Sequence, residues 1–99
     1  MKPKLFILQM PFTDADGNLW FCSHCTLIEG ALLVNSHWKD RIDIKRIPSA
    51  KPRQELVEIL GEEEQWMPVL ILQDKETIKD PIKITQYLAK TYGGAFPHP

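Results

Sequence analysis

The sequence predicts an α/β domain with a mixed four-stranded sheet that carries helices on both faces. Apolar runs alternate along the chain with segments of helical period, in the order β-α-β-α-β-β-α. Two of the predicted strands are apolar throughout, which is typical of strands covered on both faces. The chain has 99 residues and is 43% hydrophobic, so one core can form without disulfide or metal staples. We therefore expect residues 1–99 to form a single domain, with residues 94–99 as a frayed tail.

The first half of the chain predicts a strand, a loop and a buried helix. Residues 5–8 form a short apolar run, and residues 13–18 are polar and turn-rich. Residues 25–34 carry apolar side chains on most of a helical circumference. Gly30 lies in the middle of that helix, where glycine costs up to about 1 kcal/mol relative to alanine. We therefore expect Gly30 to mark a close approach to the sheet.

The second half predicts two strands that differ in burial, a hairpin partner and two further helices. Residues 41–47 alternate at period two, which indicates a strand at a sheet edge. A right-handed crossover makes this strand parallel to the first one. The remaining elements are a helix over residues 54–60 ending at Gly61, a buried strand over residues 68–72, its partner over residues 76–78, and a last helix capped by Asp80, opened by Pro81 and ended by Gly93.

Charge and length exclude several classes of function. Twelve basic and thirteen acidic residues give a net charge of −1, which does not fit a general nucleic-acid binder. The apolar stretch over residues 5–8 is too short for a signal peptide, and nothing approaches a membrane span. We therefore expect a cytoplasmic protein with neither nucleic acid nor membrane as a partner. A local basic stretch is interpreted as a solvated strand edge, with an anion or partner site as the alternative; it comprises Lys39, Arg41, Lys45, Arg46, Lys51 and Arg53.

The motif Cys22-Ser23-His24-Cys25 stands where the first loop enters the buried helix. Because thiols stay reduced in the cytoplasm, a close cysteine pair there favours catalysis or metal binding. The positive end of the helix dipole favours a thiolate at Cys22. Cys25 lies one turn later and can attack a mixed disulfide formed at Cys22. The alternatives are inert thiols and half of a zinc site completed by His24 with His37 or His98. Structural zinc usually needs a second cysteine pair, so we expect no metal.

A second motif is Met67-Pro68-Val69, a proline that opens an otherwise central strand. Proline cannot donate to a strand ladder, so Pro68 needs a reason, and a cis bond facing the thiols would supply one. Three aromatic residues flank the two motifs and could form an apolar rim for a substrate or could serve as core and loop anchors; they are Trp20, Phe21 and Trp66.

With these two motifs the chain resembles the thioredoxin superfamily, and within it the glutaredoxin branch most closely. The cysteine motif matches the redox motif, and Met67-Pro68-Val69 matches the strand that begins with a cis proline. The segments Tyr87-Leu88 and Tyr92-Gly93 are similar to the last helix of glutathione transferase N-terminal domains. More narrowly, four segments resemble a family of uncharacterised bacterial thioredoxin-like proteins of unknown function: Phe21-Cys22-Ser23-His24-Cys25, Glu29-Gly30, Lys51-Pro52-Arg53 and Leu60-Gly61-Glu62.

The resemblance implies a thioredoxin-like fold and assigns roles to site residues. Cys22 would be the nucleophile and Cys25 the resolving thiol, with Ser23 and His24 tuning the thiolate. The Met67 backbone beside Pro68 and Trp66 would pair with a bound peptide or with glutathione. Asp80 matches the acidic residue that grips the γ-glutamyl end of glutathione in relatives. Pro81 follows it here and offers neither a hydroxyl nor a backbone N–H.

The leading hypothesis is a thiol-disulfide oxidoreductase of glutaredoxin type that acts through Cys22 and Cys25. Its substrate would be a protein disulfide or a low-molecular-weight disulfide, with no bound cofactor and with glutathione as a candidate co-substrate. The alternative is a binding module without turnover, similar to a glutathione transferase N-terminal domain, that holds a peptide or thiol compound beside Pro68. A third hypothesis is metal handling through Cys22, Cys25 and a histidine.

Overall fold

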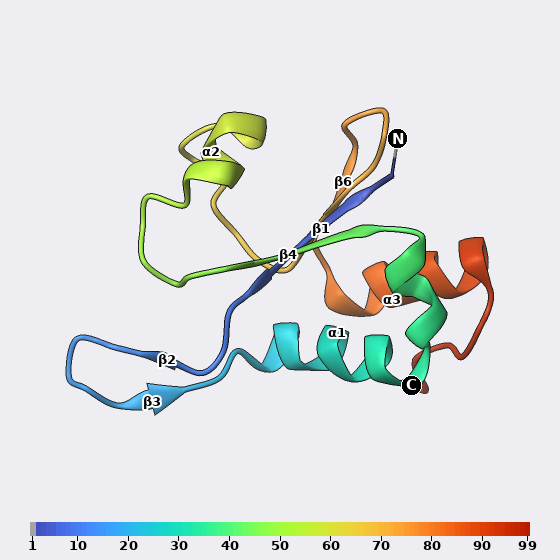
Figure 1. The fold of residues 1–99 in the computed structure, drawn as a ribbon, viewed down its shortest axis with the longest axis horizontal. Coiled ribbons are helices and arrows are strands. Elements are labelled where there is room, and N and C mark those ends of the chain that lie inside the picture. Colours follow the sequence, from blue (N-terminus) through green and yellow to red (C-terminus); the bar gives the residue numbers. More distant parts are fainter. Residues whose placement is uncertain (1) are drawn as a thin grey trace.

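A computed structural model, which describes residues 2–99, shows an α/β fold with a mixed four-stranded sheet (Figure 1). The order of the strands across the sheet is β4-β1-β5-β6. β1 pairs in parallel with β4, as the crossover rule predicts, and antiparallel with β5, while β5 pairs antiparallel with β6. β4 lies at an edge, as predicted. The strands are β1 (Lys4–Leu8), β4 (Asp43–Ile47), β5 (Val69–Ile71) and β6 (Thr77–Ile78).

Three α-helices accompany the sheet: α1 (Ser23–Val34), α2 (Gln54–Leu60) and α3 (Pro81–Tyr92). α3 begins as predicted, because the Asp80 carboxylate accepts the backbone N–H groups of Ile82 and Lys83 and because Pro81 occupies the first helical position. α2 ends at Gly61, whose φ of 96° suits a residue without a Cβ. Within residues 2–99 no helix combines the length and the apolar character that a membrane crossing needs.

β1 lies between two apolar layers, and its side chains from Leu5 to Ile7 point alternately into one layer and the other. Leu5 and Ile7 join the larger cluster, which packs α1 and α3 against the sheet, while Phe6 joins a smaller cluster under α2. Figure 1 shows α2 on the opposite side of the sheet from α1 and α3. Helices therefore cover both faces, and the apolar run predicted for residues 5–8 is buried for that reason.

Two short elements depart from the predicted order. The first is a two-stranded hairpin formed by β2 (Phe12–Thr13) and β3 (Leu19–Trp20). The segment that was expected to be only a turn-rich loop connects these two strands. A 3₁₀ helix, η1 (Ser36–Asp40), follows α1 and buries Trp38 completely. The indole N–H of Trp38 donates to the Gly93 carbonyl at 2.8 Å, which ties η1 to the end of α3.

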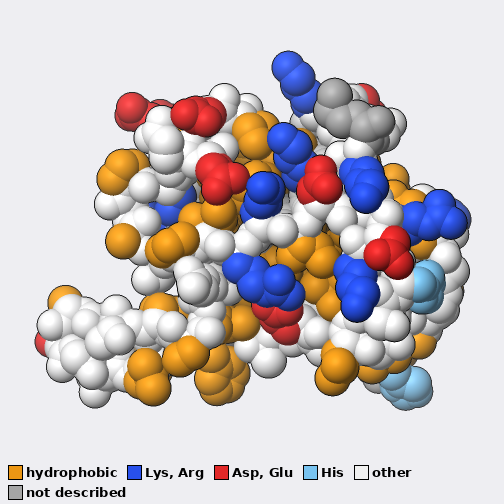
Figure 2. Space-filling view, in the orientation of Figure 1, with side chains coloured by type: hydrophobic (Ala, Val, Ile, Leu, Met, Phe, Trp, Pro, Cys, Tyr) orange, Lys and Arg blue, Asp and Glu red, His pale blue; other side chains and the backbone are white. Residues whose placement is uncertain are grey.

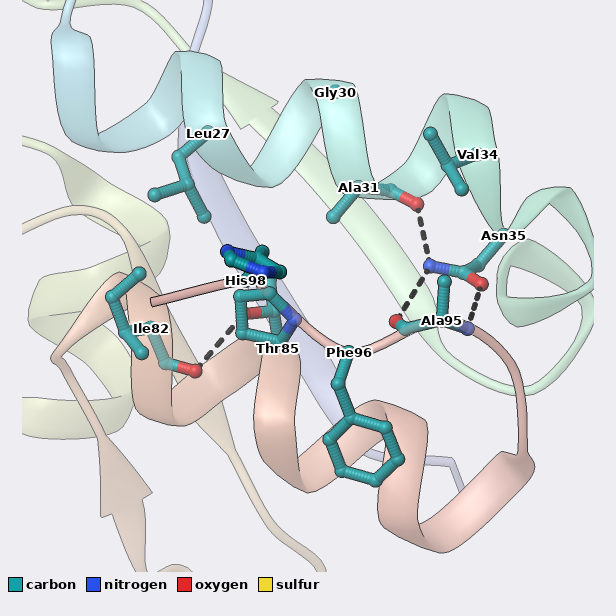
Figure 3. A pocket seen from close by; sticks show the side chains of 11 residues that line it. Leu27, Gly30, Ala31, Val34, Asn35, Ile82, Thr85, Ala95, Phe96 and His98 are labelled. Carbon is teal, nitrogen blue, oxygen red and sulfur yellow. Dashed lines mark hydrogen bonds between the residues drawn. The ribbon is translucent and has the colours of Figure 1, made fainter.

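The expectation for Gly30 is wrong. Gly30 lies on an exposed side of α1, and a Cβ placed there would meet no atom within 4 Å. It borders a groove of about 320 Å³ between α1, α3 and the C-terminal residues (Figure 3). Gly30 therefore faces open space and does not mark a close approach of α1 to the sheet.

Asn35 fixes the start of the C-terminal segment that was predicted to be frayed. Its buried side chain accepts the Ala95 N–H at 2.7 Å and donates to the Ala95 carbonyl at 3.3 Å and to the Ala31 carbonyl at 3.1 Å. Figure 3 shows this reciprocal pair joining the end of α1 to the tail. The chain reaches Ala95 through Gly94, whose φ is 119°.

Two glycine-to-alanine variants should change stability in opposite directions. Gly94→Ala should lower the free energy of unfolding by about 1–3 kcal/mol, because φ is unfavourable for alanine and the new Cβ clashes with Asn35 Oδ1. Gly30→Ala should raise it by up to about 1 kcal/mol, because it gains helix propensity in open space. Urea unfolding of both variants measures the difference, and equal effects would contradict the arrangement described for Asn35.

Candidate functional site

Cys22 occupies the N-cap of α1, at the junction between the hairpin and the helix. Its backbone is extended, with φ −83° and ψ 118°, and its Sγ accepts the Cys25 backbone N–H at 3.3 Å. Helix starts leave N–H groups without intrahelical partners, and a serine or aspartate oxygen usually accepts one of them. Here the sulfur has that role. The half-buried Cys22 thiol therefore lies at the positive end of the helix dipole.

The backbone of Cys22 is held by two further residues. Its N–H donates to Met10 Sδ at 3.2 Å, and its carbonyl accepts the Thr26 hydroxyl at 2.7 Å and the Thr26 N–H at 2.9 Å. The Thr26 hydroxyl also lies 3.7 Å from Met10 Sδ. Sequence reasoning missed Met10, because nothing in its neighbourhood distinguishes a thioether that accepts a hydrogen bond from one that only fills space.

Cys25 has the opposite environment. Its side chain is completely buried, and its Sγ accepts the Leu8 N–H at 3.4 Å. Burial raises the pKa of the Cys25 thiol to about 12; the Leu8 N–H opposes this rise and the neighbouring Cys22 side chain adds to it. Both cysteines are free thiols. The motif thus holds one accessible thiol and one protected thiol that stays protonated.

The second predicted motif packs against the same core. Met67 is half-buried and contacts both apolar clusters, and Cys22 contacts the cluster that contains Cys25. Pro68 is buried, and the Met67–Pro68 bond is cis. Trp66 is exposed, with the Lys51 ammonium 5.7 Å from its ring centroid.

Arg53 holds the segment that precedes Trp66. Its guanidinium donates to the carbonyls of Ser49 and Gln65, and its backbone N–H donates to Gln65 Oε1 at 2.7 Å. Partial burial lowers the pKa of Arg53. Arg53 thereby ties the turn before α2 to the residues that lead into Met67 and Pro68.

The interpretation of the basic stretch as a solvated edge needs correction at Arg53, whereas Arg46 is exposed on the edge strand β4 as expected and has an ion-pair partner in addition. Arg53 serves the turn just described, and Arg46 on β4 forms a bidentate ion pair with Glu29 on α1, with both N–O distances 2.8 Å. The ion pair raises the pKa of Arg46. No local pattern predicts the contact of Arg53 with Gln65 or that of Arg46 with Glu29, because these partners lie 12 and 17 positions apart along the chain.

The remaining predicted site residues form no hydrogen bond with the Cys22 side chain within the part of the chain that the structure describes. Ser23 and His24 are exposed in the first turn of α1, and over residues 2–99 neither side chain forms a hydrogen bond with Cys22. The Asp80 carboxylate caps α3, so its assigned contact with glutathione stays a prediction. For the metal hypothesis, the described residues bring together no three side chains of the types that bind metal ions. His37 contacts the Gly93 carbonyl at 2.9 Å instead.

Cys25 should make stability depend on pH above neutrality. Its ordinary pKa is 9.0, the value expected in the unfolded chain, against about 12 in the folded protein. As pH rises, the unfolded state therefore releases the Cys25 proton at a lower pH than the folded state does. The contribution of the Cys25 thiol to the free energy of unfolding is complete below pH 9 and is lost as pH rises towards 12. Between pH 8 and pH 10 the wild type should lose about 1.4 kcal/mol more than Cys25→Ala. Denaturant unfolding at both pH values measures this loss, and Cys22→Ala, which keeps the buried thiol, should behave like the wild type.

The comparisons with known proteins give a family and no closer relative. No curated protein and no solved structure matches the chain at a significant level. One family model, described as a protein of unknown function (DUF3088), matches residues 2–96 and so spans the sheet, the helices and both cysteines. The chain therefore belongs to the DUF3088 family.

Proposed function

We propose that this protein is a thiol-disulfide oxidoreductase of glutaredoxin type, with Cys22 as nucleophile and Cys25 as resolving thiol. The observation that carries the proposal is the hydrogen bond from the Cys25 N–H to Cys22 Sγ at the start of α1. A hydrogen bond to a sulfur at the positive end of a helix favours the thiolate, which is the reactive form of cysteine. Partial exposure of Cys22 leaves it within reach of a substrate.

The arrangement of the sheet and helices supports a thioredoxin-like fold as part of this proposal. Without the added hairpin and η1, the order of elements is β-α-β-α-β-β-α, with the sheet order β4-β1-β5-β6. The cysteine pair begins α1, and a proline precedes the central strand β5. These features together resemble that superfamily, which is what the two motifs imply.

The reaction would proceed in two exchanges. The Cys22 thiolate attacks one sulfur of a disulfide, the S–S bond breaks, and the released thiolate takes a proton from solvent. The product is a mixed disulfide at Cys22. Cys25 then loses its proton and attacks Cys22 Sγ, so that the second substrate thiol leaves and a Cys22–Cys25 disulfide forms. The substrate gains two electrons, and two molecules of a thiol such as glutathione return them to the protein.

The unequal burial of the two cysteines supports the order of these steps. Cys25 holds its proton until the mixed disulfide places an attackable sulfur beside it, because burial penalises its thiolate. Met67 and Pro68 would form one wall of the site through the Met67 backbone, and Trp66 would contact the substrate. Ser23 and His24 would act on the thiolate from the first turn. Such a cycle suits the cytoplasm, where low-molecular-weight thiols are abundant.

Serine variants of the two cysteines should separate the two steps. Cys22→Ser should abolish reduction of a peptide disulfide by glutathione, because no nucleophile remains. Cys25→Ser should accumulate a mixed disulfide at Cys22 that mass spectrometry detects, because the resolving thiol is missing. Full activity of Cys22→Ser would overturn the proposal. Saturable binding of a thiol compound beside Pro68, without turnover by the wild type, would favour the binding-module alternative.

Alkylation of the reduced protein should modify only one cysteine. At pH 8 iodoacetamide should react with Cys22 and leave Cys25 unmodified, since Cys25 is fully buried and remains a thiol. In denaturant both cysteines should react. Peptide mapping by mass spectrometry assigns the sites, and equal labelling of both in the folded protein would contradict the unequal roles.

A further inference from the structure

The hairpin before Cys22 extends away from the body of the protein. Figure 1 shows β2 and β3 projecting beyond the first turn of α1. The hairpin is short, with Phe12 opposite Trp20 and Thr13 opposite Leu19. Over residues 2–99, β3 pairs with β2 alone, so its other edge has no strand beside it.

One carboxylate organises the turn of this hairpin. Asp14 Oδ1 accepts the N–H groups of Asp16 at 3.0 Å and Asn18 at 2.9 Å, and Oδ2 accepts the Trp20 indole N–H at 2.7 Å. The hydrogen bond from Trp20, followed by those from Asn18 and Asp16, lowers the pKa of Asp14. The polar atom of Trp20 is therefore satisfied within the hairpin, and the rest of its ring is presented as apolar surface.

Three consecutive apolar side chains end this hairpin at the nucleophile. Leu19 is 70% exposed, Trp20 51% and Phe21 66%, and Cys22 follows directly. We call these three residues the apolar arm. Figure 2 shows hydrophobic side chains along the lower edge of the projecting hairpin, with no lysine or arginine among them. Exposed apolar side chains on either face of a strand end, next to a candidate reactive group, are typical of an interaction site.

The position and chemistry of the apolar arm favour one class of ligand over two others. A small hydrophilic disulfide such as oxidised glutathione carries charged groups and has no apolar side chain to bury there. A second copy docked arm to arm would cover the surface next to Cys22, through which a disulfide must approach. An extended apolar segment of a protein can bury its side chains on the arm, and its backbone can pair with the open edge of β3.

We propose that the apolar arm docks an extended, apolar protein segment that carries the disulfide attacked by Cys22. This inference rests on the proposed function and names its substrate class. The disulfide lies in the docked segment, so binding on Leu19, Trp20 and Phe21 brings its sulfur to the N-cap of α1. The arm is therefore a specificity element for protein disulfides, outside the cysteine motif itself.

The test compares two substrates in variants of the arm. Leu19→Ser combined with Phe21→Ser keeps the Asp14–Trp20 hydrogen bond, and Trp20→Ala removes the central ring. Each should lower kcat/KM for an apolar peptide disulfide by about tenfold or more, because buried aromatic anchors dominate such contacts. Neither should change kcat/KM for oxidised glutathione more than about twofold, since that substrate does not use the arm. The control is Leu33→Ser with Val34→Ser, two exposed residues at the far end of α1.

Binding is measured separately, so that docking and chemistry can fail independently. The probe is the same peptide, reduced and alkylated, titrated against Cys22→Ser protein by calorimetry. Loss of peptide binding in the arm variants, but not in the control, supports the docking assignment. If the wild type turns over neither substrate, the proposed function is overturned, and with it the attack by Cys22 on the docked segment. Equal losses for both substrates, unchanged peptide kinetics and binding, or dimerisation abolished by the arm variants would each overturn the docking assignment.

Discussion

The hydrogen bond from the Cys25 N–H to Cys22 Sγ fixes both where α1 begins and where the accessible thiol lies. A neutral sulfur is a weaker acceptor than the oxygen that usually caps a helix. The same bond becomes charge-assisted, and stronger, when the sulfur is a thiolate. The strength of this capping contact therefore depends on the chemical state of the Cys22 sulfur, and a disulfide at that sulfur would weaken it.

Contacts around this bond keep the helix start in place when the cap changes. Met10, which precedes the helix, and Thr26, in its first turn, both hold the backbone of Cys22, so the position of the thiol does not depend on the sulfur contact alone. Further along α1, Glu29 pairs with Arg46 on β4, which is an exposed contact and adds about 0–1 kcal/mol. The helix is thus fastened at two points to elements that precede and follow it.

Much of the scaffold follows from the sequence, because period and capping are local signals. The helix over residues 54–60, the cap at Asp80 and the edge position of β4 are as predicted. The position of both cysteines at a helix start was also predictable. The finer fold assignment and the roles of His24 and Asp80 remain proposals.

What the sequence could not predict depends on distant contacts. Trp38 is buried in the larger apolar cluster, and its indole N–H donates to Gly93, 55 positions away. No local sequence pattern indicates either contact. Gly30 suggested close packing, whereas it borders a groove whose other side includes the tail, and Asn35 at the end of α1 holds that tail at Ala95. Met10 and Arg53 form hydrogen bonds with Cys22 and Gln65, which are distant along the chain. The conformations of the intervening loops bring these partners together, and those conformations depend on the tertiary structure.

The hydrogen bond from Leu8 to Cys25 has a practical meaning for observing the protein in solution. Leu8 is the last residue of the central strand, and its amide proton points at the buried sulfur. Any change in the charge or bonding of that sulfur alters the electronic surroundings of this one proton. The Leu8 amide resonance therefore reports on the charge and bonding of the Cys25 sulfur, so nuclear magnetic resonance can observe an atom whose side chain is completely buried.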